Sequence, residues 1–188
     1  EAVVTVLRQH ASVAGVVEPA CEAIRNLAGT NDDNRIRLAS VGACEAVVTV
    51  LRQHASVAGV VEPACEAIRN LAVNDDNEVR LASVGACEAV VTVLRQHTSV
   101  VGVAEKACRA IRNLSANTNN KVLLANVGAC EAVVTVLRQH ASVAGVVEQA
   151  CRVIVNLATN NDDNKVRLAS VGACEAVVRV LEQHASVA

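Results

Sequence analysis

Apolar residues return every three or four positions along most of this chain, which is the spacing of one helix face. The clearest stripe lies in residues 12–28 and extends over four turns. Its members are Val13, Val16, Val17, Ala20, Ile24 and Leu27. A strand, whose side chains repeat every two residues, does not fit this stripe. We therefore predict a helix here, with Ser12 as its N-cap.

Two prolines fall inside this predicted helix and its next copy. Pro19 and Pro63 each remove a backbone donor and crowd the carbonyl one turn earlier. Either the helix kinks at the proline, or residues 12–18 form a separate turn and the helix restarts.

A second apolar stretch, residues 43–54, is rich in β-branched residues, which also favour strands. Val47, Val50, Leu51 and His54 nevertheless lie at i, i+3, i+4 and i+7, which indicates a helix. His54, at its end, is expected to interact with the last carbonyls of that helix.

A shorter helix is predicted near residues 34–41, after the polar run Asn31-Asp32-Asp33-Asn34. Asn and Asp side chains cap helix N-termini by accepting from free amides. Gly42 follows this helix and suits a left-handed turn into the next one.

These three pieces repeat along the chain. The same glutamate recurs at positions 1, 45, 88, 131 and 175, so the period is 43 or 44 residues. Such a period is typical of a solenoid of stacked supersecondary units. We predict one repeat domain over 1–188, with complete repeats at 31–73, 74–116 and 117–160 and partial repeats at 1–30 and 161–188.

Composition and net charge argue against two classes of function, nucleic-acid binding and membrane insertion. Apolar residues make up 52% of the chain, which has no aromatic residue, and the net charge is −2. That balance offers no electrostatic attraction for nucleic acid or an anionic membrane. Charged residues or His interrupt every apolar run before the ~18 residues that a membrane span needs.

Eight cysteines occupy two slots of the repeat: Cys21, Cys65, Cys108 and Cys151 in one, and Cys44, Cys87, Cys130 and Cys174 in the other. Stacked slots lie too far apart for disulfides, and no Cys-x-x-Cys occurs to suggest zinc. We expect buried thiols, no metal or other cofactor, and an intracellular, reducing compartment unless the chain is synthetic.

No catalytic residues are predicted. His-Ala-Ser recurs at 10–12, 54–56, 140–142 and 184–186, but no orienting carboxylate or oxyanion loop accompanies it. A polar helix end followed by a serine cap explains the motif better than a nucleophile.

Together these features resemble the armadillo repeat over essentially the whole chain. The resemblance rests on the unit length, the three helices, the glycine between the first two, and the third-helix ending Ala-Ile-Arg-Asn-Leu-Ala at 23–28 and 67–72. It implies an all-α, right-handed α-solenoid of three-helix repeats. Near-identity of the copies also suggests a designed, consensus-like or excised chain.

The resemblance further implies that third-helix asparagines hold the backbone of an extended peptide. The matching residues are Asn26, Asn70, Asn113 and Asn156. A local hydrogen bond at a helix end is the alternative role for each. One turn earlier, where peptide-binding members often carry Trp, this chain has Glu22, Glu66, Arg109 and Arg152.

If those four side chains face the groove, one half of it is acidic and the other basic, and a peptide of opposite polarity would bind in one orientation. The alternative is that they are solvated charges paired within one helix, such as Glu22 with Arg25. The leading hypothesis is a non-enzymatic scaffold for an extended peptide or protein segment. The rival hypothesis is a structural module that forms homo-oligomers through uncapped solenoid ends.

Overall fold

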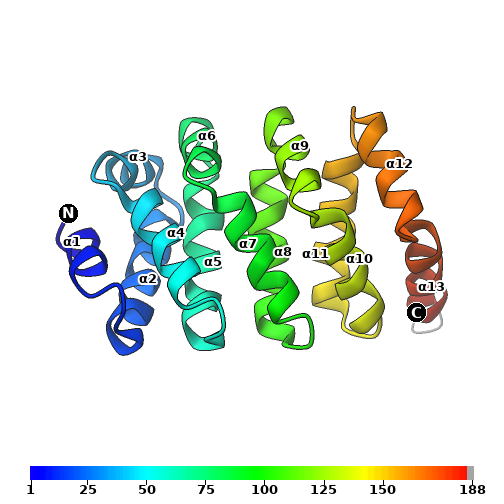
Figure 1. Cartoon of the computed structure of the whole chain (residues 1–188), viewed down its shortest axis with the longest axis horizontal. Coiled ribbons are helices and arrows are strands. Elements are labelled where there is room, and N and C mark those ends of the chain that lie inside the picture. The colour runs from blue at the N-terminus through cyan, green and yellow to red at the C-terminus, as the bar shows by residue number, and fades with distance from the viewer. Residues whose placement is uncertain (186–188) are drawn as a thin grey trace.

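The protein is an all-α solenoid, as the repeat pattern predicts. The computed structural model describes residues 1–185, which form thirteen helices and no strand. Figure 1 shows these helices in a row along the long axis, with the two termini at opposite ends. The third helix expected to begin at residues 186–188 lies outside the described residues.

The first helices of the repeats are short and polar. They are α3 (Asp32–Ser40), α6 (Asp75–Ser83), α9 (Thr118–Asn126) and α12 (Asp162–Ser170). The predicted asparagine caps are confirmed: Asn31 accepts a hydrogen bond from the Asn34 amide at 2.8 Å. We predicted that the helix starts at residue 34. The cap is Asn31, so the helix begins at Asp32 instead.

The second helices follow a tight glycine turn. They are α1 (Ala2–Gln9), α4 (Ala43–Gln53), α7 (Ala86–Gln96), α10 (Ala129–Gln139) and α13 (Ala173–Ala185). Gly42 has a φ of +88°, so the left-handed turn predicted at this position is confirmed. The strand alternative is wrong, because Val47, Val50 and Leu51 are all buried on a continuous helix.

The third helices are the longest elements in most repeats. They are α2 (Ala14–Ala28), α5 (Ala58–Leu71), α8 (Val101–Leu114) and α11 (Ala144–Ala158). The predicted Ser12 cap is wrong: Val13 precedes α2 in extended backbone, and no side chain caps the helix. The predicted restart is also wrong, since α2 and α5 run through Pro19 and Pro63 without interruption.

Side-chain burial follows the predicted stripe with one exception. Val17, Ala20 and Ile24 of α2 are buried in a core shared by all the repeats. Leu27 is 47% exposed, whereas its counterparts Leu71, Leu114 and Leu157 are fully buried. The reason is positional, because each third helix packs on its neighbours and α2 has a neighbour, α5, on one side only.

Hydrogen bonds between side chains and backbone join each repeat to the next. Arg8 donates to the Val41 carbonyl at 3.0 Å, in the glycine turn of the following repeat. His54 Nε2 lies 2.7 Å from the Ala11 carbonyl of the preceding repeat. His54 was expected to serve the end of its own helix, and that expectation is wrong because the imidazole points across the repeat boundary.

The helices described in residues 1–185 are short compared with a bilayer-spanning helix. No single helix there is long and apolar enough to cross a bilayer; α9 and α10 reach that length and apolarity only as a pair bent by 75°. Both helices pack against neighbouring helices of the solenoid.

Candidate functional site

The four third helices form one wall of the solenoid and carry most of the candidate residues. α2, α5, α8 and α11 lie side by side in that order. Asn26, Asn70, Asn113 and Asn156 occupy the last turns of these helices. Because the repeats stack, the asparagines at equivalent positions of successive third helices form a row of amide side chains across the wall.

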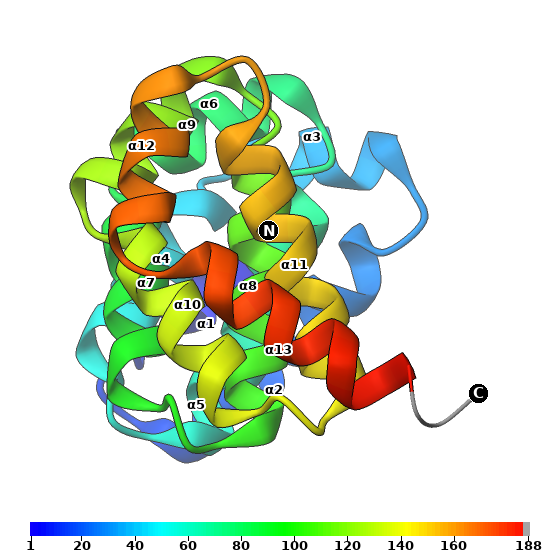
Figure 2. The same cartoon turned by 90° about the vertical axis from the view of Figure 1, so that its right-hand side faces the viewer.

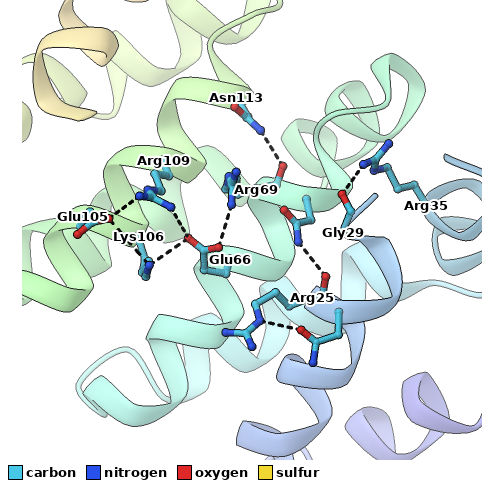
Figure 3. A network of polar contacts seen from close by, with 11 residues as sticks. Arg25, Gly29, Arg35, Glu66, Arg69, Glu105, Lys106, Arg109 and Asn113 are labelled. Atoms are coloured by element: carbon cyan, nitrogen blue, oxygen red, sulfur yellow. Dashed lines mark hydrogen bonds and ion pairs between the residues drawn. The ribbon is translucent and has the colours of Figure 1, made fainter. Parts of the chain in front are cut away.

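Three of these asparagines bind the backbone of the preceding third helix. Asn70 Nδ2 donates to the Arg25 carbonyl at 2.8 Å. Asn113 Nδ2 donates to the Arg69 carbonyl at 2.8 Å, as Figure 3 shows. Asn156 Nδ2 donates to the Arg112 carbonyl at 2.9 Å. The role of these three is therefore not local to one helix: they join neighbouring repeats.

These bonds leave part of each amide available. A side-chain amide has two donor hydrogens and an accepting oxygen, and each inter-repeat bond uses one hydrogen. Asn26, at the start of the row, is exposed and instead accepts from Arg25 Nε at 3.2 Å. The row thus offers donor and acceptor groups on successive third helices, and in three of the four the inter-repeat bond orients the amide.

The charged positions one turn earlier form a network where α5 meets α8 (Figure 3). Glu66 is only 7% exposed. Its carboxylate pairs with Arg69 at 3.0 Å, Lys106 at 3.7 Å and Arg109 at 4.0 Å. Arg109 also pairs with Glu105 at 2.6 Å. Three basic side chains therefore compensate the charge of this buried carboxylate within the protein.

This network corrects the division into an acidic and a basic half. The acidic position of α5 and the basic positions of α8 neutralise one another across the repeat boundary instead of facing a ligand separately. The expected Glu22–Arg25 pair is also replaced, since Arg25 donates to Asn26. Glu22 is exposed, and Arg152 pairs with Glu148 at 3.0 Å within α11.

A hollow of about 330 Å³ opens between the ends of α2 and α5. It brings together three predicted site residues, Asn26, Glu66 and Asn70, with Arg25, Gly29 and Thr30. Gly29 lies where the next repeat has Val73, so the absence of a side chain widens the hollow at this boundary.

An arginine precedes three of the four asparagines, at a position that our sequence reasoning did not assign to the site; Val155 precedes Asn156. Arg25, Arg69 and Arg112 supply the carbonyls that the next asparagine binds, and their guanidinium groups are only partly buried. The recurring Ile-Arg-Asn-Leu motif carried this signal, but it was used only to recognise the repeat.

Elsewhere in the described residues, the groups to consider are metal ligands and cysteine thiols. No group of three or more His, Cys, Asp or Glu side chains within residues 1–185 could hold a metal ion. All eight cysteines are free thiols, and six are buried. Burial raises the pKa of Cys21 and of Cys108 to about 12, so these thiols stay protonated and unreactive at neutral pH.

Several solved structures similar to this chain are engineered or designed proteins. One, an engineered protein, has a TM-score of 0.86 at 25% identity, covering 96% of this chain and 72% of that chain. A designed armadillo repeat protein in complex with the peptide (KR)4 has a TM-score of 0.83 at 23% identity, with 96% and 73% covered. Computationally designed armadillo repeat proteins for modular peptide recognition match with a TM-score of 0.83, 24% identity and the same two coverages.

Sequence comparison gives the family directly. No curated protein matches the chain. The family model described as LRRK2 ARM repeat matches residues 1–187, nearly the whole length. This match agrees with the three-helix repeat, the glycine turn and the row of third-helix asparagines. The chain belongs to the LRRK2 ARM repeat family and is an armadillo-repeat protein.

Proposed function

We propose that this protein is a non-enzymatic scaffold that binds an extended peptide or protein segment along the wall of α2, α5, α8 and α11. The observation that carries the proposal is the row of asparagine amides. Three of them are fixed in orientation by a bond to the preceding helix, and each keeps one donor hydrogen and its oxygen.

An extended backbone suits such a row because its N–H and C=O groups alternate and need both acceptors and donors. A side-chain amide provides both, so it can hold a peptide unit without reading the peptide's side chain. Preorganised amides also bind at lower entropic cost than mobile ones.

The groups beside the amides favour a charged segment over an apolar one. Arg25, Arg69 and Arg112 flank the asparagines with partly exposed guanidinium groups. The chain contains no aromatic residue to provide the hot spots that dominate many interfaces. We therefore expect moderate affinity that weakens as salt is added. A designed armadillo repeat protein of the same fold is in complex with the basic peptide (KR)4. Arg25, Arg69 and Arg112 would repel such a peptide, so the segment expected here is acidic.

The test uses a mixed library of unstructured ten-residue peptides, with retained peptides identified by mass spectrometry and their affinities measured by fluorescence anisotropy. Replacing Asn70 and Asn113 together by alanine should weaken binding by about tenfold to a hundredfold, because two hydrogen bonds to the peptide backbone are lost.

Replacing Asn70 and Asn113 also removes two hydrogen bonds between repeats and so lowers stability. The control variant should therefore lose an inter-repeat bond as well, but away from the asparagine row. His97→Ala removes the bond between His97 Nε2 and the Ala55 carbonyl, which is 2.7 Å long and lies beyond the opposite end of α8 from Asn113. It should leave peptide affinity unchanged. Failure of every peptide to bind, or equal binding by the double variant, would contradict the proposed function.

A further inference from the structure

The first helix of the third complete repeat, α9, differs from the other first helices because it carries no exposed charge. Helices α3, α6 and α12 each begin with two exposed aspartates. In α9 the corresponding residues are Thr118 and Asn119. The one charged residue of α9, Lys121, is buried and donates to the Thr159 carbonyl at 3.1 Å. The exposed face of α9 is therefore uncharged.

Two neighbouring aliphatic side chains lie on this face. Val122 is 46% exposed and Leu123 is 44% exposed. Where α9 has Leu123, the other first helices carry Arg37, Arg80 and Arg167. The centres of protein interfaces are depleted of charged residues, so an uncharged apolar face of this kind is suited to one.

In two other repeats the arginine at this position binds a glutamate of the preceding second helix. Arg80 Nε lies 2.7 Å from Glu45 Oε1, and Arg167 Nε lies 2.9 Å from Glu131 Oε1. Helix α7 packs on α9 as α4 packs on α6 and α10 packs on α12. The corresponding glutamate of α7 is Glu88, and the leucine of α9 cannot pair with it.

The Glu88 carboxylate forms no hydrogen bond or ion pair with any residue of 1–185. Glu88 is exposed, whereas Glu45 and Glu131 are partly buried. It lines a hollow of about 210 Å³ between α4 and α7, together with Leu51, Arg52, Ala55, Ala89 and Thr92. A polar group that enters this hollow would therefore meet an acceptor that nothing else in the described chain uses.

Arg52, which also lines the hollow, does not replace the missing arginine. It donates to the Val84 carbonyl at 3.0 Å. Arg8 donates to the Val41 carbonyl at 3.0 Å in the same way, and Glu45 nevertheless binds Arg80 in that repeat. A glutamate at this position therefore accommodates a second arginine beside the one in the glycine turn.

We propose that the exposed face of α9 and the carboxylate of Glu88 form a docking surface for a partner protein segment that presents an arginine beside aliphatic side chains. The guanidinium binds Glu88 as Arg80 and Arg167 bind the equivalent glutamates within the chain. The aliphatic side chains of the partner cover Val122 and Leu123. Arginine suits the site better than lysine, because its planar group matches carboxylate geometry and is more weakly hydrated.

This docking surface is separate from the wall of third helices. Figure 2 looks along the solenoid and shows α7 and α9 to the left of α11. The wall carries partly exposed arginines beside its asparagines and should bind an acidic segment, whereas the docking surface should bind a basic one. The two proposals can therefore fail separately.

The test uses a mixed library of ten-residue peptides in which a central arginine has two aliphatic residues on each side. Peptides retained by the whole chain are identified by mass spectrometry, and their affinities are measured by fluorescence anisotropy. Glu88→Gln should weaken binding about tenfold, because a charged acceptor is replaced by a neutral one. Glu45→Gln is the matched control and should leave the affinity unchanged, since Arg80 already occupies Glu45.

A second variant fills the site from within the chain. Leu123→Arg introduces the residue that the other first helices carry, so its guanidinium should pair with Glu88 and weaken peptide binding at least about tenfold. This variant should fold, because Leu123 is exposed. Replacing the arginine of a retained peptide by citrulline, which keeps the shape without the charge, should weaken binding equally. The joint replacement of Asn70 and Asn113 by alanine should leave these affinities as they are.

Three results would overturn the proposal. One is a library from which no peptide is retained. Another is retained peptides that bind Glu88→Gln and Leu123→Arg as tightly as they bind the parent chain. The third is arginine amide alone binding as tightly as the peptides, because the aliphatic contact would then contribute nothing.

Discussion

At the scale of single residues, glycine fixes the turn between the first two helices of each repeat. Gly42, Gly85, Gly128 and Gly172 have φ values of +83° to +88°, which other residues rarely adopt. A Cβ at Gly85 would also meet the guanidinium of Arg52, which donates to the Val84 carbonyl beside it. The missing side chain therefore serves both the turn and the bond between repeats.

Gly85→Ala should lower the free energy of unfolding by about 1–2 kcal/mol or more, through left-handed strain and the displaced Arg52. Gly15→Ala is the matched control, because Gly15 lies inside α2 and a Cβ there would meet nothing within 4 Å. It should raise stability by about 0.5–1 kcal/mol. Urea unfolding of both variants measures these changes in the free energy of unfolding. Equal changes of the same sign would contradict the role given to the positive φ and to Arg52.

Residue roles were predictable from the sequence where they depend on the local backbone. The Asn31 cap and the left-handed Gly42 follow from rules that involve only neighbouring residues. The bonds of Asn70 and His54 were not predictable, because each partner lies about one repeat away. Periodicity gives the distance between two copies of a side chain but not the direction in which either points.

At the scale of helices, the contact between α6 and the start of α9 depends on a buried acid. Glu78 is buried and accepts hydrogen bonds from the Asn117 amide at 2.7 Å and from Asn120 Nδ2 at 3.4 Å. Burial raises the pKa of Glu78 above that of an ordinary glutamate. This carboxyl therefore stabilises the fold most when it is protonated.

The sign of the pH effect follows from linkage. A raised carboxyl pKa contributes stability that is full below the ordinary glutamate pKa and is lost as the pH rises through the raised value. Glu78→Gln keeps an accepting oxygen without the charge. It should raise the free energy of unfolding at pH 7 by about 1 kcal/mol and flatten its decline above the ordinary glutamate pKa. Asp76→Asn, an exposed change on the same helix, should leave the pH profile as it is.

Helix type and order were predictable, whereas two details of the helices were not. The stripe in residues 12–28 gave a third helix, and its continuity through Pro19 shows that packing outweighs one lost backbone bond. The sequence left open whether Glu66 and Arg109 face the groove or pair within their own helices; both pair within their helices, and they also pair with one another. Sequence alone could not show that α5 and α8 bring these side chains within 4.0 Å.

At the scale of the whole molecule, burial decreases from the interior repeats toward the C-terminal end, and the cysteines report this. Cys44, Cys87 and Cys130 are buried, whereas Cys174 in the same slot is exposed. Burial raises the pKa of Cys44 and of Cys87 to about 12. One repeated thiol therefore differs in reactivity only through its place in the stack.

Brief alkylation at pH 8 followed by peptide mass spectrometry should label Cys174 first and the half-buried Cys151 next. The six buried thiols should react only when the protein unfolds. The same labelling in denaturing urea, where all eight thiols should react, provides the control.

The slot occupied by Glu78 has a consequence for how such a chain can grow by duplication. Its counterpart in the next repeat, Lys121, donates to the Thr159 carbonyl at 3.1 Å, whereas Glu78 accepts from a backbone amide. If these two repeats exchanged places without the loops that follow them, the Glu78 carboxylate would face the Thr159 carbonyl, and the Lys121 ammonium would face the Asn117 amide. Neither pair can form a hydrogen bond. A repeat can therefore be duplicated or deleted only as a segment that keeps each first helix together with the loop that it contacts. The boundaries of that segment differ from those of the three-helix repeat.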